Sequence, residues 1–271
     1  MNNILNNRQK VKILNTVHTG DNLKVMRFIE DKFIDLIYLD PPYYSQTKYK
    51  NKDNEFSDNW KDIDEYLNFM KVRIVEMHRI LKSTGSIYLH VDYHAVFELK
   101  ILMDEIFSRT NFRNEIIWHY GLGAANAKST YLKKHDNILF YSKNKEYTFN
   151  LQRGDVTPQM RAKYCHKDEN GKFMMSKGKR YYLKGGKPLD SVWDIPTLSP
   201  TAKERVDYPT QKPLELLERI INVSSNKGDI VLDPFCGSGT TLKAAKNLER
   251  NYIGIDEQNR ATEISKKRNE K

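Results

Sequence analysis

Residues 229–241 read DIVLDPFCGSGTT, a short apolar strand that runs into a glycine-rich turn and then a helix. Glycine at positions 237 and 239 lets a ligand approach the backbone closely, and the amino terminus of the following helix attracts negative charge. A second strand, residues 251–255, ends at Asp256. An acidic residue about 20 positions beyond such a turn is where doubly wound folds bind ribose hydroxyls. The sequence therefore predicts an α/β fold with a nucleotide-like cofactor at this turn.

A nicotinamide dinucleotide is the rival ligand for the same turn. The turn reads Gly237-Ser238-Gly239-Thr240-Thr241-Leu242, so the third glycine of the dinucleotide fingerprint is missing. This departure disfavours an NAD-dependent enzyme, and a cofactor-binding assay separates the two classes.

Candidate catalytic residues follow an earlier strand. Residues 33–39 are nearly continuous in apolar and β-branched side chains, which is typical of a buried parallel strand, and Asp40-Pro41-Pro42-Tyr43 comes directly after them. Ligands of open α/β sheets bind outside the carboxyl ends of strands. There the Asp40 carboxylate, the Pro41 carbonyl and the Tyr43 ring can meet one planar amine. A strand followed by a proline turn without chemistry is the plainer interpretation of these four residues alone.

Together the motifs resemble those of the amino-methylating DNA methyltransferases, which use S-adenosylmethionine. Asp40-Pro41-Pro42-Tyr43 is similar to the family's catalytic motif, and residues 233–241 are similar to its cofactor loop. Tyr208-Pro209-Thr210-Gln211-Lys212-Pro213 resembles the block that completes the methionine side of the cofactor site, although the family usually has histidine where this chain has Tyr208. The catalytic motif precedes the cofactor motif, as in the circularly permuted beta class.

The resemblance implies a Rossmann-like α/β methyltransferase fold, circularly permuted, with a mostly parallel central sheet and an inserted target-recognition region. Residues 1–120 would form the catalytic half of the core, and residues 208–271 the cofactor-binding half. Residues 121–207 would hold the rest of an edge hairpin, at about 114–143, followed by the target-recognition region.

The implied cofactor is S-adenosylmethionine. Thr210 or Lys212 would meet its carboxylate, Phe235 would pack near its sulfonium, and Asp21 would lie next to its adenine. Asp21 is equally well explained as a cap for a helix over residues 23–29. The candidate cofactor residues are Asp21, Thr210, Lys212, Asp233, Pro234, Phe235, Cys236, Gly237, Ser238, Gly239, Thr240 and Asp256.

Composition favours an anionic partner. Lys and Arg number 45 against 35 Asp and Glu, which gives a formal charge of +10 and a pI near 9.3. Nucleic acid is the first candidate partner, and a merely lysine-rich soluble protein is the alternative. No apolar run approaches the ~20 residues of a membrane span, and the start shows no secretory pattern, so we expect a cytoplasmic protein. Cys165 and Cys236 make neither a disulfide framework nor a zinc cluster.

Three segments are candidate DNA contacts. From residue 150 to 207 periodicity fades and basic residues alternate with aromatic ones, a composition that suits phosphate and stacking contacts. The other two are the loop after residue 120 and a flap over residues 44–60, and a solvated loop is the alternative for residues 150–207. The candidate residues are Lys48, Tyr49, Lys128, Lys177, Lys179, Arg180 and Tyr181. The implied partner is double-stranded DNA, with a cognate restriction endonuclease and a homodimer as further possibilities.

The chemistry follows from the target amine, whose lone pair is delocalised into the base. Asp40 and the Pro41 carbonyl would each accept one amine hydrogen, while Tyr43 stacks on a base flipped out of the duplex. His90 and Asp92, beside the catalytic strand, are weaker candidates for shaping the pocket. No metal is required.

Asp40 favours adenine N6 as the target, because the cytosine-N4 subfamily usually begins its motif with serine. Methyltransferases of RNA or protein glutamine more often show asparagine there. A catalytically silent DNA-binding relative is the alternative from another class.

Overall fold

The computed structural model describes residues 13–45, 48–51, 54–57, 60–121, 129–206 and 208–270. The chain divides into two compact units: a larger one, up to residue 149 and from residue 192 onward, and a smaller one, residues 150–191. Each is described by itself. Within the described ranges, no helix is both long and apolar enough to cross a bilayer.

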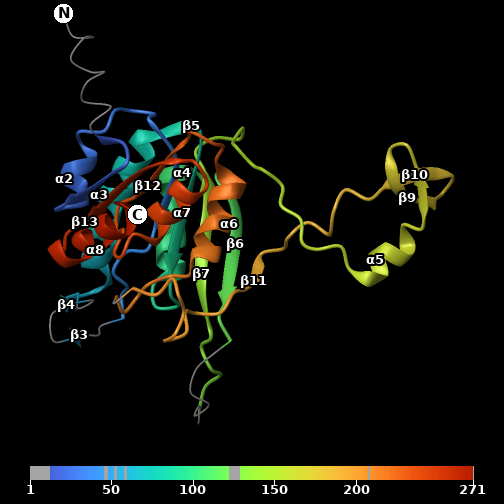
Figure 1. The fold of residues 1–271 in the computed structure, drawn as a ribbon. Helices are drawn as coiled ribbons and strands as arrows, with labels where there is room; N and C mark the ends of the chain where they lie inside the picture. The colour runs from blue at the N-terminus through green and yellow to red at the C-terminus, as the bar shows by residue number, and fades with distance from the viewer. Residues whose placement is uncertain are drawn as a thin grey trace, which may run out of the picture. The chain divides into compact units, whose positions relative to one another are not determined.

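An eight-stranded sheet forms the centre of the larger unit (Figure 1). Neighbouring strands are parallel except at β7, which runs against both of its neighbours. The predicted mostly parallel central sheet is therefore confirmed. In spatial order the strands are β1 (Thr16–Thr19), β13 (Asn251–Asp256), β12 (Ile230–Asp233), β2 (Ile34–Leu39), β5 (Leu81–Val91), β7 (His135–Ser142), β6 (Phe112–His119) and β11 (Val192–Asp194).

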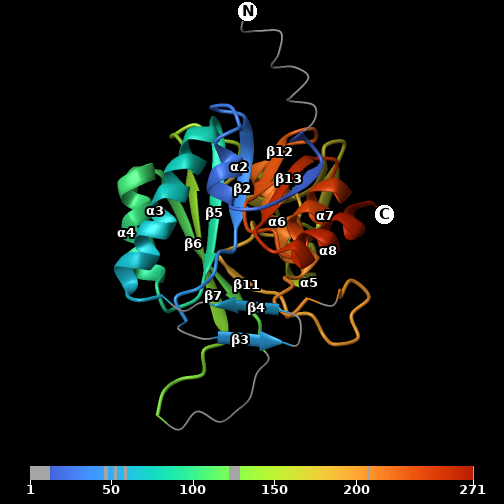
Figure 2. The same cartoon turned by 90° about the vertical axis from the view of Figure 1, so that its left-hand side faces the viewer.

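Helices cover both faces of this sheet (Figure 2). Strand β2 shows why, because Ile37 and Leu39 belong to one core cluster while Leu36 and Tyr38 belong to the other. One face packs against α2 (Asn22–Met26), α3 (Ile63–Ile80) and α4 (Val96–Phe107), and the other packs against α6 (Leu214–Ser224) and α7 (Thr240–Asn247). The remaining helical elements of this unit are η1 (Arg109–Asn111) and α8 (Asn259–Glu270), and α8 packs beside α7.

Helix α3 forms where the apolar stripe of residues 62–81 predicts it. Asp62 caps its amino terminus by accepting a hydrogen bond from the Glu65 amide at 2.9 Å, and the Glu65 carboxylate accepts one from the Lys61 amide at 2.7 Å. The stripe is buried through Tyr66, Met70, Ile74, Met77 and Ile80.

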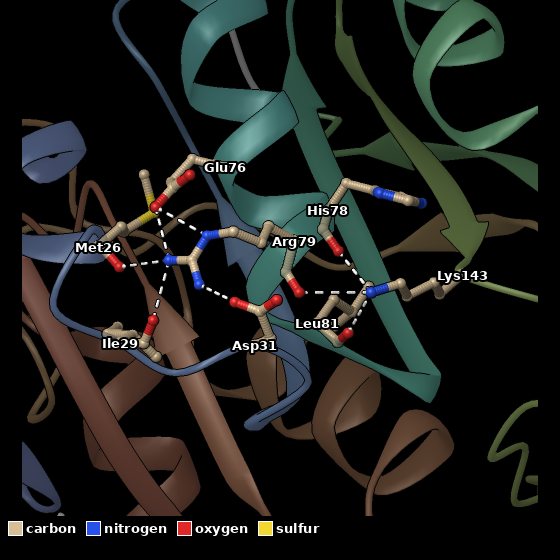
Figure 3. A network of polar contacts seen from close by, with 8 residues as sticks. All are labelled: Met26, Ile29, Asp31, Glu76, His78, Arg79, Leu81 and Lys143. Carbon is tan, nitrogen blue, oxygen red and sulfur yellow. Dashed lines mark hydrogen bonds and ion pairs between the residues drawn. The ribbon is translucent and has the colours of Figure 1, made fainter. Parts of the chain in front are cut away.

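Two cations hold the carboxyl end of α3 (Figure 3). Arg79 donates to the carbonyl oxygens of Met26 and Ile29 at 3.1 and 2.9 Å, which ties α3 to the loop after α2. Lys143, just beyond β7, donates to the carbonyl oxygens of His78 and Leu81, both at 2.6 Å. The last carbonyl groups of a helix lack partners within the helix, so Lys143 supplies a donor to His78 at the end of α3, and Arg79 supplies one to Met26 at the end of α2.

Strands β6 and β7 pair antiparallel, in the region expected to form a hairpin at the sheet's edge. The outermost strand, however, is β11, which pairs parallel with β6. Its three residues carry no pattern that the sequence analysis could use. In the segment expected to be a flap, the backbone forms two short antiparallel strands, β3 (Lys48–Asn51) and β4 (Asn54–Ser57).

The smaller unit contains a three-stranded antiparallel sheet in the order β10-β9-β8. Its elements are α5 (Pro158–Lys163), β8 (His166–Asp168), β9 (Gly171–Ser176) and β10 (Lys179–Tyr182). Helix α5 begins at the cap residue Thr157, whose hydroxyl accepts from the Met160 amide at 3.2 Å. The segment in which the sequence periodicity fades thus has a regular fold.

Candidate active site

A cavity of about 570 Å³ opens at the carboxyl ends of strands β2, β12 and β13. Because parallel strands end at the same edge of a sheet, the catalytic and cofactor motifs meet there despite their separation in sequence. Every candidate catalytic and cofactor residue lines this cavity except Gly239, which lies behind its wall.

Asp40 has a partner at each carboxylate oxygen. Tyr43 donates its hydroxyl to Oδ1 at 2.6 Å, and Lys212 donates its ammonium to Oδ2 at 2.5 Å. Burial, and next the charge of Asp40, raise the pKa of Tyr43 well above its usual value, so its hydroxyl stays protonated and remains a donor. The sequence predicts Lys212 as a contact of the cofactor carboxylate, and that stays a prediction; in the structure its ammonium bonds to Asp40.

The glycine turn is fastened to the end of β13 by Asp256. Its carboxylate accepts from the amides of Gly237 and Gln258 at 2.8 and 2.9 Å. Burial raises the pKa of Asp256. A carboxylate offers about four acceptor positions, so Asp256 keeps acceptor capacity toward the cavity.

Gly239 has a steric reason for being glycine. It has a φ of +75° at the cap position of α7, and a Cβ atom added to it would lie 2.2 Å from the Ser265 hydroxyl oxygen. Both facts make any side chain unfavourable at this position. The backbone of the turn at Gly239 therefore packs directly against the side chain of Ser265 on α8.

Asp233 accepts hydrogen bonds from two groups of the protein itself. It accepts from the Thr241 hydroxyl at 2.5 Å and from the Phe235 amide at 3.1 Å, and it is almost completely buried. This burial raises its pKa to about 7. Although Asp233 lies among the lining residues, its observed contacts tie the end of β12 to the first turn of α7.

One wall of the cavity is held by Arg73, which the sequence analysis missed. Its guanidinium donates to Asp21 at 2.9 Å and to the side-chain oxygen of Asn22 at 2.8 Å, and Asn22 in turn donates to the Pro234 carbonyl at 2.8 Å. Asp21 also accepts from the Leu23 amide at 3.0 Å, so it caps α2, as the plainer interpretation predicts, and lines the cavity as well.

Aromatic side chains form the neighbouring wall. The Arg73 guanidinium lies 3.5 Å from the centroid of the Phe69 ring, and Phe69 and Phe235 have ring centroids 6.4 Å apart. Trp60 packs on Phe69 at 5.0 Å and donates its indole N–H to the Tyr43 carbonyl at 3.3 Å. The spacing of Phe69 and Arg73, one helical turn apart, was the signal available in the sequence.

Tyr208 packs on the glycine turn at the position where the family usually has histidine. A Cβ atom at Gly237, which has a φ of +48°, would lie 3.2 Å from the Tyr208 ring. Burial raises the pKa of Tyr208, so its hydroxyl is protonated at neutral pH.

A DNA methylase family model matches residues 34–267, most of the chain. The chain belongs to this DNA methylase family. It is 36% identical to the type II methyltransferase M.HpaI of Haemophilus parainfluenzae, over 91% of this chain and 71% of that protein. It is 33% identical to the type II methyltransferase M.EcaI of Enterobacter cloacae, over 84% of this chain but only 63% of that protein. The DNA adenine methyltransferase YhdJ of Escherichia coli K12 is 34% identical, over 89% of this chain and 78% of that protein.

Solved structures show that this DNA methylase shares its fold with methyltransferases of lower sequence identity. The M1.HpyAVI–SAM complex aligns with a TM-score of 0.62 at 24% identity, covering 93% of this chain and 98% of the other. The cytosine-N4-specific PvuII DNA methyltransferase aligns with a TM-score of 0.67 at 17% identity, covering 93% and 85%. The predicted Rossmann-like α/β fold is confirmed, and the permuted motif order stays a prediction.

Beside strand β2 of this DNA methylase lies a buried chain of polar side chains. The Tyr38 hydroxyl lies 2.7 Å from His90 Nδ1, and His90 Nε2 lies 3.1 Å from the Asp136 carboxylate. The ring centroids of His90 and Tyr43 are 6.5 Å apart. His90 is fully buried and is not among the cavity's lining residues, so its contact with Tyr38 supports strand β2 from outside the cavity. Asp92 instead pairs with the neighbouring His94 at 2.6 Å.

The candidate DNA contacts belong to segments that the structure describes only in part. The side chains of Lys48 and Tyr49 lie outside the described part of the chain, as does Lys128. The other four candidates are exposed residues of the smaller unit, in and around the β9–β10 turn: Lys177, Lys179, Arg180 and Tyr181.

Proposed function

We propose that this protein transfers a methyl group from S-adenosylmethionine to the exocyclic N6 amine of an adenine flipped out of duplex DNA. One observation carries the proposal: Asp40 and the Gly237 turn line the same cavity. Asp40 is held there by hydrogen bonds from Tyr43 and Lys212. Membership of the DNA methylase family supports methyl transfer to DNA. Asp40, where cytosine-N4 enzymes usually have serine, supports adenine, as does the similarity to YhdJ.

The residues around the cavity suit S-adenosylmethionine. Its volume of about 570 Å³ is within the usual range of small-molecule sites. Asp256 offers acceptors for ribose hydroxyls, Thr210 offers a hydroxyl for the carboxylate, and Phe235 offers an apolar face. When bound, the cofactor supplies an electrophilic methyl group.

Asp40 has acceptor capacity left for the target amine. Tyr43 and Lys212 use one position on each oxygen of a carboxylate that has about four. One amine hydrogen can therefore bond to Asp40 and the other to the Pro41 carbonyl, which aims the nitrogen lone pair at the methyl group. As the nitrogen attacks, it gains positive charge that the anionic Asp40 stabilises. The amine proton becomes acidic only after the methyl group has been transferred, and Asp40 then accepts it and passes it to water.

Typical free energies show which interaction contributes most to the rate of methyl transfer. Flipping the base costs a few kcal/mol, and aromatic stacking on the flipped base stabilises it by ~1–3 kcal/mol. A hydrogen bond to a charged group contributes ~1.5–3 kcal/mol, whereas alignment of two reactants contributes up to ~7–11 kcal/mol. The orientation of Asp40 is therefore the feature on which the rate depends most.

Methylation of cytosine N4 is the alternative, since it uses the same chemistry. Purified protein would be incubated with S-adenosylmethionine and duplex DNA of mixed sequence, and the DNA would then be digested to nucleosides for mass spectrometry. We expect N6-methyladenine. Finding N4-methylcytosine instead would replace the proposed target base while keeping the family assignment. A cognate restriction endonuclease, homodimer formation and a cytoplasmic location stay predictions.

A further inference from the structure

The small sheet of residues 150–191 has two chemically different faces. In an antiparallel sheet, directly opposed residues point to the same face and successive residues alternate between faces. Tyr182 is opposite Phe173 and Arg180 is opposite Met175, while Phe173 is also opposite His166. These side chains, together with Asp168, therefore share one face.

This first face is occupied by contacts within the unit. The Asp168 carboxylate accepts from Arg180 at 2.8 Å and from the Tyr182 hydroxyl at 2.9 Å. Phe173 is buried between His166 and Tyr182, with ring centroids at 5.3 and 5.7 Å. The Arg180 guanidinium also lies 5.0 Å from the Phe173 ring. Arg180 is thus engaged in holding the small sheet together.

Within the residues that the structure describes, the second face has no ion pair, side-chain hydrogen bond or ring contact. It carries Lys167, Lys172, Lys179 and Tyr181, which we name the lysine face, and all four are exposed. Lys167 is directly opposite Lys172 across the β8–β9 pair. Within the described part of the chain, none of the three lysines forms an ion pair with a carboxylate, and Arg180–Asp168 is the ion pair of this sheet.

Folding alone does not account for this arrangement. Like charges directly opposite each other in a strand pair are destabilising, by the ~0.2–1 kcal/mol typical of cross-strand pairs. A partner with closely spaced negative charges would attract both lysines and so offset their mutual repulsion. Duplex DNA carries one negative charge per ~1.7 Å of its axis, and lysines that neutralise phosphates release bound counterions.

We infer that the lysine face is the surface with which this unit binds the phosphate backbone of duplex DNA. The inference rests on the proposed function and names the docking surface for its substrate. It also reassigns one predicted contact, because Arg180 belongs to the opposite face and stabilises the sheet through Asp168. Lys177 lies in the β9–β10 turn, with a φ of +47°, and belongs to neither face.

Adjacent residues of β10 provide a matched test. Lys179→Gln and Arg180→Gln remove one positive charge each, from neighbouring positions on opposite faces. Binding of the whole-chain variants to a fluorescent duplex oligonucleotide would be measured by anisotropy between ~50 and ~200 mM salt. The slope of log K against log salt falls in magnitude by about 0.9 for each phosphate that the protein no longer neutralises. We expect that decrease for Lys179→Gln and no decrease for Arg180→Gln.

The triple variant Lys167→Gln/Lys172→Gln/Lys179→Gln extends the measurement. We expect its slope to fall by about 2–3 and its affinity at ~100 mM salt to fall at least tenfold, with an unchanged circular dichroism spectrum. If wild-type protein binds DNA but the triple variant keeps the wild-type slope, the lysine face is not the docking surface and the proposed function stands. If the wild-type protein shows no salt-dependent DNA binding, the proposed function fails, and the lysine-face inference with it.

Discussion

Lys212 Nζ lies 2.5 Å from Asp40 Oδ2, a contact between residues 172 positions apart in the sequence. Lys212 belongs to the block expected on the cofactor side of the site, whereas Asp40 begins the catalytic motif. Both side chains are largely buried, so the ion pair is shielded from solvent screening. The pair joins the two halves of the site at the carboxylate that would hold the target amine.

Replacing Lys212 should therefore slow methyl transfer. Lys212→Met removes one of the two donors that orient Asp40. At ~1.5–3 kcal/mol for a hydrogen bond to a charged group, kcat should fall about ten- to a hundredfold. Single-turnover methylation of duplex DNA would measure this, and Lys212→Arg, which keeps a charged donor, should retain more activity. A Lys212→Met enzyme with wild-type kcat would show that the ion pair has no part in catalysis.

Gly239 should tolerate alanine poorly, for two separable reasons. The positive φ costs ~1–3 kcal/mol for a non-glycine residue, and the added Cβ overlaps Ser265. Gly228→Ala is the control, because its φ is +85° and nothing lies within 4 Å of the added atom. We expect Gly239→Ala to lower the melting temperature more than Gly228→Ala does, and Ser265→Gly to recover part of the difference. Equal losses for the two glycine variants would argue against the overlap.

Asp233 should make stability depend on pH. Burial raises its pKa from 3.8 to about 7 in the folded protein, so between about pH 4 and pH 7 the unfolded chain loses a proton that the folded protein keeps. The free energy of unfolding therefore falls as pH rises through this window, by roughly a few kcal/mol at ~1.4 kcal/mol per pKa unit.

Asp233→Asn should remove this contribution while retaining an acceptor for the Phe235 amide. Urea unfolding without cofactor, at pH 5 and pH 8, would measure the difference between variant and wild type. Asp64→Asn, at an exposed position on α3, is the control and should keep the wild-type dependence. The same pH dependence in Asp233→Asn as in wild type would exclude Asp233 as its source.

Lys143 should contribute to stability without a role in catalysis. Lys143→Met leaves the carbonyl groups of His78 and Leu81 without their donor, at the carboxyl end of α3 (Figure 3). An unsatisfied buried acceptor costs ~1–3 kcal/mol, so we expect a loss of about 2–3 kcal/mol in the free energy of unfolding. Lys145→Met, at an exposed position two residues on, should cost little. Wild-type stability of Lys143→Met would show that water replaces the ammonium at no cost.

Much of the fold could be predicted because its signals are local. The strand before Asp40, the strand–turn–helix of residues 229–247 and the stripe of α3 each appear in a short window of sequence. The convergence of Asp40, Gly237 and Asp256 followed from one geometric rule, that parallel strands end at a common edge.

The remaining features depend on side-chain contacts between distant segments. Nothing near Lys212 in the sequence indicates that it bonds to Asp40. Arg73 appears as a polar interruption of an apolar stripe, and its partners Asp21 and Asn22 are known only once α2 and α3 are packed. The strands of the smaller unit are three to six residues long and mostly polar, so their alternation is too weak to recognise without the pairing register.

Under the proposed function, Asp40 directs methylation of adenine N6 in DNA. This role would be tested by expression in a host lacking DNA methylation, followed by single-molecule sequencing that maps modified bases, with Asp40→Ala in parallel. We predict methylated adenines within one short sequence motif in the wild-type sample and none in the Asp40→Ala sample. Methylation confined to cytosine, no methylation by a folded wild-type protein, or adenine methylation that persists in Asp40→Ala would contradict this role of Asp40.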